Sequence, residues 1–120
     1  MTVNNVEYAG PWIGAQRVQD LLHIDTPELA RRLANREILG CVFRSGNTFF
    51  PSRQFLNGGV VPGLKDVLDL LMEGDPDRET CVLWLAGSPG DGISNWDHLR
   101  AGRLQLVLKE AQRDASRWNQ

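Results

Sequence analysis

The stretch Phe49–Gly63, which reads FFPSRQFLNGGVVPG, separates two halves of the chain that differ in pattern. Its three phenylalanines are typical of the closing edge of a small packed unit, and Asn57-Gly58-Gly59 is a turn signal. Pro62-Gly63 then precedes a clean helical pattern. The stretch predicts a mainly α-helical protein with two domains. Residues 1–56 form a helix-turn-helix head with a small β-hairpin, and residues 57–120 form a bundle of helices.

The size and composition are those of an ordinary soluble protein. The 120 residues suit one domain or two small units that share a core, and 42% of them are hydrophobic. No apolar run approaches the roughly 20 residues of a membrane span, and the start of the sequence does not resemble a signal peptide. Cys41 and Cys81 lie far apart with no CxxC motif, which favours reduced thiols over a disulfide. We therefore expect a cytoplasmic protein that has no membrane partner.

The charge is distributed unevenly but mildly between the halves. Residues 1–56 carry six Arg and five acidic residues, 6 − 5 = +1, and residues 57–120 carry seven basic and ten acidic residues, 7 − 10 = −3. No global field therefore draws the chain to nucleic acid. Any contact with DNA must come from the local placement of arginines.

Two short helices are predicted early in the chain. Apolar residues at helical spacing indicate a helix over about residues 14–22, and three residues then form a tight connection. Thr26-Pro27 starts a second helix, with Thr26 as the N-cap. The apolar stripe of this helix is Leu29, Ala30, Leu33 and Ala34.

The other side of the second helix is polar and rich in guanidinium groups. Two short helices joined by a three-residue turn are the helix-turn-helix pattern, whose second helix enters the major groove. Arginine binds guanine edges and phosphates, and asparagine pairs with adenine. The alternative is an ordinary solvated face. The polar residues are Glu28, Arg31, Arg32, Asn35 and Arg36.

A β-hairpin is predicted directly after the second helix. Residues 38–44 are rich in strand-forming residues, residues 45–47 form a turn, and residues 48–50 form a second short strand. This order is that of a winged helix-turn-helix. Arg44 and Arg53 flank the hairpin and are expected to reach phosphates, or else to be ordinary surface residues. The predicted DNA-binding set is therefore Thr26, Glu28, Arg31, Arg32, Asn35, Arg36, Arg44 and Arg53.

The second half reads as helices separated by glycines. Residues 63–73 have a strong amphipathic pattern, and Asp75-Pro76 is expected to cap and start a helix that extends to Ala86. This last segment is apolar nearly all round, so a buried strand is the alternative. An irregular loop follows at residues 87–92. Two more helices are predicted over about residues 95–101, with a Ser94–Asp97 capping box, and over about residues 103–117.

The order of these motifs resembles a known family. The residues concerned are Phe50–Phe55 (FPSRQF), Pro62-Gly63-Leu64, Asp75-Pro76, Ser88-Pro89 and Leu99–Gly102 (LRAG). They resemble proteins that carry an antitoxin toxin-binding domain of the Xre/MbcA/ParS type, here behind a MerR- or excisionase-like head. The resemblance covers about residues 12–115 and depends on the order of the motifs. It implies a transcription-regulating antitoxin of a toxin-antitoxin system.

Such a protein binds double-stranded operator DNA through its head and a cognate toxin through its C-terminal helices. In several of these systems the toxin is a RES-domain enzyme that consumes NAD. A homodimer is expected because one small head gives little affinity. Tryptophan is frequent at interface hot spots, and packing within the helical core is the alternative reading of Trp96 and Trp118. The predicted protein-binding residues are Trp96, Leu99, Arg100, Leu104 and Trp118.

Enzymatic chemistry has little support in the sequence. His23 and His98 are isolated from ligand-spaced Cys or Glu, so we predict no metal site and no cofactor. Ser94, Asp97 and His98 are triad residue types, but the capping box explains the first two better. We therefore predict a protein that is not an enzyme. Two alternatives to an antitoxin stay open: a protein-interaction module whose head has lost DNA binding, and an orphan regulator without a toxin.

Overall fold

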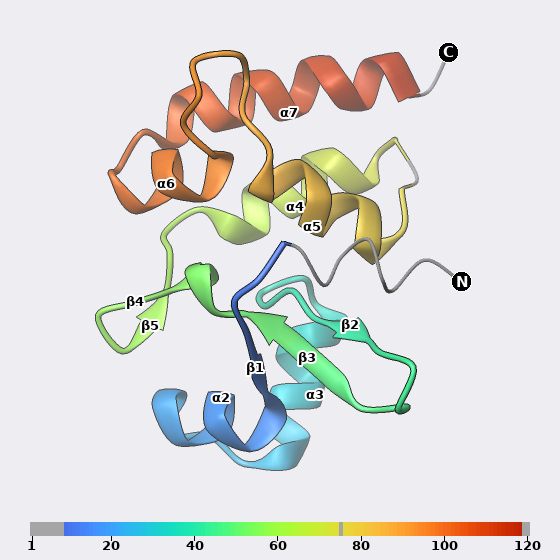
Figure 1. The fold of residues 1–120 in the computed structure, drawn as a ribbon, viewed down its shortest axis with the longest axis vertical. Helices are drawn as coiled ribbons and strands as arrows, with labels where there is room; N and C mark the ends of the chain where they lie inside the picture. Colours follow the sequence, from blue (N-terminus) through green and yellow to red (C-terminus); the bar gives the residue numbers. More distant parts are fainter. Residues whose placement is uncertain (1–8, 75, 119–120) are drawn as a thin grey trace.

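The computed structural model describes residues 9–74 and 76–118, which form a mainly helical structure with two small antiparallel sheets (Figure 1). The N-terminal half contains β1 (Trp12–Gly14), α2 (Ala15–Leu22), α3 (Thr26–Ala34), β2 (Cys41–Val42), β3 (Thr48–Pro51), the 3-10 turn η1 (Ser52–Gln54) and β4 (Phe55–Leu56). The C-terminal half contains β5 (Gly59–Val60), α4 (Leu64–Met72), α5 (Arg78–Ala86), α6 (Asn95–Arg100) and α7 (Leu104–Trp118). No helix in these two ranges is both long and apolar enough to cross a membrane.

The larger sheet has the strand order β1-β3-β2, with β3 in the centre. Trp12 lies opposite Pro51, and Cys41 lies opposite Phe49. The hairpin of β2 and β3 was predicted, although β2 has two residues instead of the seven of residues 38–44. The strand β1 was missed. Its three residues are too few for a periodic signal, and its partner β3 is distant in the sequence.

A second hairpin joins β4 and β5 at the predicted turn. Asn57 and Gly58 have φ angles of 54° and 78°, as a two-residue type I′ turn requires at both central positions. The expectation of helices alone after residue 56 was therefore wrong at β5, where Gly59 pairs with Leu56. The Asn-Gly pair carried the signal for this hairpin and was interpreted only as a turn.

The helices α2 and α3 lie below the larger sheet in Figure 1 and share a small core with it. Val18, Leu29 and Phe50 are buried there, from α2, α3 and β3. The N-cap of α3 is Asp25, whose Oδ1 accepts a hydrogen bond from the Glu28 backbone N–H at 3.0 Å. The prediction of Thr26 as the N-cap was wrong by one residue, because an aspartate immediately before it serves the same purpose.

The C-terminal half is built around α4 and α7, which pack against each other through the apolar side of α4. Gly63 precedes α4 with a φ of 88°, and a Cβ there would overlap the side chain of Leu104. The helix α5 begins at Arg78 with Asp77 as its N-cap, so the predicted start at Pro76 was early. Asp75 lies outside the described residues. Ser94 caps α6 as predicted, since its Oγ accepts from the Asp97 N–H at 3.1 Å.

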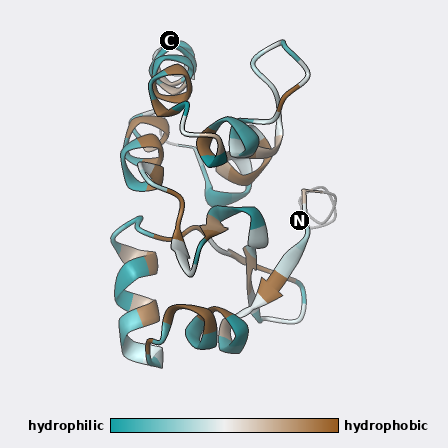
Figure 2. Cartoon of the chain, turned by 90° about the vertical axis from the view of Figure 1, so that its left-hand side faces the viewer, coloured by the Kyte–Doolittle hydropathy of each residue, from teal (hydrophilic) through white to brown (hydrophobic). Residues whose placement is uncertain are grey.

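The two halves share buried contacts along their seam (Figure 2). Leu39 and Cys41 of the head belong to the same buried cluster as the apolar residues of α4, α5 and α7. Gln54 lies at this seam with no exposed surface. Its Nε2 donates to Leu39 O at 2.7 Å and to Pro51 O at 3.1 Å, and its Oε1 accepts from Leu39 N–H at 2.8 Å. The chain therefore forms two small units joined by a shared core.

Gln54→Leu is expected to lower the free energy of unfolding by about 3 kcal/mol. The substitution keeps the side-chain volume but leaves the buried N–H and C=O of Leu39 without partners, and each unsatisfied buried group costs about 1–3 kcal/mol. Urea unfolding followed by tryptophan fluorescence measures the change. The matched control is Gln105→Leu on the exposed side of α7, which should change stability by at most about 0.5 kcal/mol. A loss below about 1 kcal/mol for Gln54→Leu would contradict this role.

Candidate nucleic-acid interface

The helix α3 stands along one side of the lower half of the molecule, and its outer residues are open to solvent (Figure 2). Leu29 faces the core as predicted, and Leu33 is half-buried. Ala30 and Ala34, which were predicted in the same buried stripe, are exposed. Alanine is compatible with either side of a helix, so the periodic pattern did not fix their position. The exposed face of α3 therefore presents two small side chains with Arg31 between them.

Glu28 organises the guanidinium groups of α3. Its carboxylate accepts from Arg31 Nε at 2.9 Å, from Arg31 Nη2 at 2.7 Å and from Arg32 Nε at 2.8 Å. Hydrogen bonds from Arg31 and then Arg32 lower the pKa of Glu28 from 4.5 to about 2. The same bond raises the pKa of Arg31. Arg31 also donates to Glu37 at 3.1 Å, so two positive and two negative charges balance on this face.

Two predicted DNA-binding arginines turn toward the C-terminal half instead. Arg36 has a φ of 64°, and its Nη1 contacts Asp69 of α4 at 3.3 Å. Arg53 forms an ion pair with Asp97 of α6. Both contacts cross the seam between the halves, and neither guanidinium group is on the exposed face of α3. Asn35 is the exposed C-cap of α3.

Other polar groups of the head point outward. Thr26 is exposed at the start of α3, where its Oγ1 accepts from Gln19 Nε2 at 2.8 Å. Arg44 is exposed in the turn between β2 and β3. Arg17 is exposed on α2 and was not predicted, although it lies on the polar side of that helix. Neither Arg17 nor Arg44 forms an ion pair with any residue that the structure describes. These two side chains and Arg31 are the cations that the head offers to phosphates.

The predicted protein-binding residues are mostly used inside the molecule. Trp96 and Leu99 are buried in the shared core. Arg100 donates to the backbone carbonyls of Arg53 and Phe55 at 3.0 and 2.6 Å. Leu104 is half-buried against Gly63. Trp118 packs on Gly74 at the end of α4 and keeps about a third of its surface exposed, so among these five it is the side chain most open to a partner.

The histidine of α6 has a structural environment. His98 is buried; its Nε2 contacts Asp91 Oδ2 at 2.9 Å, and its Nδ1 accepts from Arg103 Nε at 2.7 Å. Backbone and side-chain hydrogen bonds, first that from Ile93 N–H, lower the pKa of Asp91. Ser94 bonds to the backbone of its own helix and not to His98. Among the described residues, no group of three His, Cys, Asp or Glu could hold a metal ion.

Comparison with known proteins gives one solved structure. No family model matches the chain, and no curated protein matches it. The fold is similar to that of Rv2175c determined by NMR, with a TM-score of 0.73 and 28% sequence identity over 88% of this chain and 82% of that chain. The similarity therefore extends over most of both chains and includes residues from both halves.

The acid–base behaviour of Glu28 is a direct check on the α3 geometry. The carboxylate should stay ionised through pH 4.5 and titrate near pH 2, because Arg31 and Arg32 stabilise its charged form. A depressed folded-state pKa stabilises the fold above the unfolded value, and this contribution is lost as the pH falls toward 2. Carbon-13 NMR of the Glu28 carboxyl between pH 6 and pH 3 measures it. In Arg31→Ala the pKa should rise toward 4.5, and an unchanged pKa would contradict the assigned bonds.

Proposed function

We propose that this chain is a DNA-binding protein whose head contacts double-stranded DNA in the manner of a winged helix-turn-helix. The observation that carries the proposal is the local order of α2, a three-residue connection and an exposed α3, followed by the β2–β3 hairpin with Arg44 in its turn. In that arrangement α3 is the element suited to the major groove, and the hairpin is suited to the neighbouring backbone.

The charges of the head favour weak binding by a single copy. Glu28 and Glu37 offset the two arginines of α3, so the remaining attraction to phosphates comes from Arg17, Arg44 and the exposed side of Arg31. We therefore include in the proposal a homodimer that places two heads on a repeated operator half-site, as a transcription regulator does. A second copy doubles the phosphate contacts without requiring a strongly basic chain.

The toxin-neutralising role stays a prediction. It comes from the family resemblance, and Trp96 and Leu99 could not touch a toxin while they remain buried. The alternative function, a protein-interaction module without DNA affinity, is favoured by one observation: Arg36 and Arg53, which were predicted to contact DNA, form ion pairs across the seam. A DNA-binding measurement separates these two functions directly.

The test uses a labelled duplex from the region upstream of the coding sequence, with binding followed by fluorescence anisotropy at several salt concentrations. Arg31→Ala and Arg44→Ala should each weaken binding and reduce the slope of log K against log salt by about 1 per head, because each removes one phosphate contact. Lys109→Ala on the exposed side of α7 is the matched control and should leave the slope unchanged. If the wild type shows no salt-dependent binding, the proposal fails. If it binds and both head variants match it, the assigned surface is wrong.

A further inference from the structure

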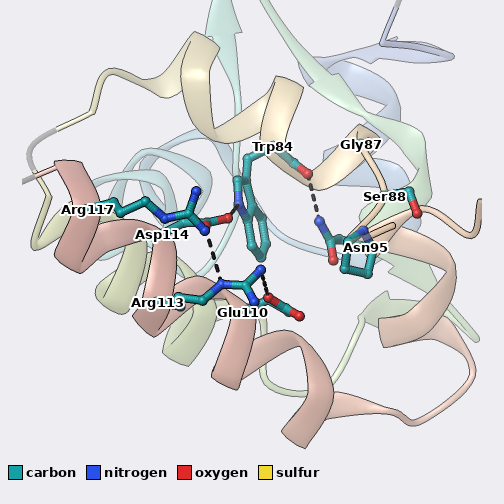
Figure 3. Close-up of a pocket in the computed structure, with 9 residues that line it drawn as sticks. Trp84, Gly87, Ser88, Asn95, Glu110, Arg113, Asp114 and Arg117 are labelled. Carbon is teal, nitrogen blue, oxygen red and sulfur yellow. Dashed lines mark hydrogen bonds and ion pairs between the residues drawn. The ribbon is translucent and has the colours of Figure 1, made fainter. Parts of the chain in front are cut away.

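A pocket of about 280 Å³ lies in the C-terminal half, away from the DNA-binding elements proposed above (Figure 3). Its walls come from the end of α5, the loop at residues 87–89, the first residue of α6 and one side of α7. No lining residue belongs to residues 9–56. A function for this pocket is therefore independent of the function proposed for the head.

The pocket contains a buried acceptor that the protein itself does not satisfy. Asn95 is 3% exposed, and its Nδ2 donates to the carbonyl oxygen of Trp84 at 2.9 Å. Its Oδ1 accepts no hydrogen bond from any described residue. Figure 3 shows this oxygen on the side that faces Trp84 and Arg113. Because buried acceptors are almost always hydrogen-bonded, the oxygen indicates that a donor enters from outside.

The remaining walls offer a flat apolar surface and several donors. The indole of Trp84 is fixed by its Nε1–H, which donates to Asp114 Oδ2 at 2.7 Å. Arg113 forms ion pairs with Glu110 and Asp114, and Arg117 forms one with Asp114. Two arginines and two acids line the pocket, so its net charge is zero. Both guanidinium groups are more than half exposed and have N–H groups available to a ligand.

An apolar residue continues the pocket along α7. Leu106, Glu110, Arg113 and Arg117 are spaced by four, three and four residues, which places them on one face of the helix. Leu106 is 37% exposed. The surface therefore combines a neutral polar pocket with an apolar contact beside it. A small polar molecule would use the pocket alone, whereas a polypeptide would use both.

We infer that this pocket docks an extended peptide segment of a partner protein. An amide N–H of the segment donates to Asn95 Oδ1, and a carbonyl oxygen of the segment accepts from Arg113. An apolar side chain of the segment packs on Trp84 or Leu106. The volume lies just below the range of small-molecule pockets, about 300–1,000 Å³. A neutral amide is favoured over a charged ligand because the lining charges cancel and the deep acceptor requires a donor.

The experiment selects ligands from a displayed library of random ten-residue peptides against the full chain. The best peptide is then synthesised and measured by titration calorimetry. Nitrogen-15 NMR should show changes at the Trp84 indole N–H and the Asn95 side-chain amide. Arg113→Ala should weaken the peptide about tenfold, as expected for one hydrogen bond to a charged group. Asn95→Ala should weaken it also, and Lys109→Ala, an exposed neighbour on α7, should stay within twofold.

Three outcomes would overturn the inference. One is that no peptide is enriched above the background of the support. Another is that selected peptides bind Arg113→Ala as tightly as the wild type; that variant lies on the surface and does not depend on the tolerance of the fold to Asn95→Ala. The last is that N-acetyl amino-acid amides bind as tightly as the peptide, which would identify a small-molecule pocket.

Discussion

The hydrogen bonds of Gln54 hold together the part of the structure on which everything else depends. One buried side chain satisfies both backbone groups of Leu39 and the carbonyl of Pro51. It thereby fixes the segment that leaves α3 against the segment that leaves β3. Both segments continue into the shared core, where Leu39 and Val61 contact the C-terminal helices. A change at this residue therefore acts on the head and on the helical half together.

The same seam explains the distribution of arginines. Arg36, Arg53 and Arg100 each reach across it, to Asp69, to Asp97 and to two backbone carbonyls. These contacts orient the head, but they also remove guanidinium groups from the face that DNA would approach. The proposed interface consequently depends on Arg17, Arg31 and Arg44, and on the duplication of these groups in a dimer.

The sequence predicted the helices well because their apolar periodicity is strong. The starts and ends of α4 and α7 were placed within one residue, and the hairpin of β2 and β3 was found in the correct place. The strand β1 was missed because its partner lies far along the chain. The destinations of Arg36 and Arg53 could not be predicted, since their acidic partners lie on α4 and α6 and no local spacing links them. The pocket beside Asn95 was missed for the same reason: its walls come from three helices and a loop, and its unsatisfied oxygen is a property of the packed structure.

The central claim is that the head and the C-terminal helices form one cooperative unit. Native-state hydrogen exchange at low concentrations of denaturant tests it most directly, through the backbone amides of Phe50 in β3 and Leu68 in α4. Both are buried, in the head core and in the shared core respectively. The account predicts that both amides exchange with the same free energy and the same denaturant dependence as global unfolding. A Phe50 amide that exchanges with a clearly smaller free energy, while Leu68 remains protected, would contradict it.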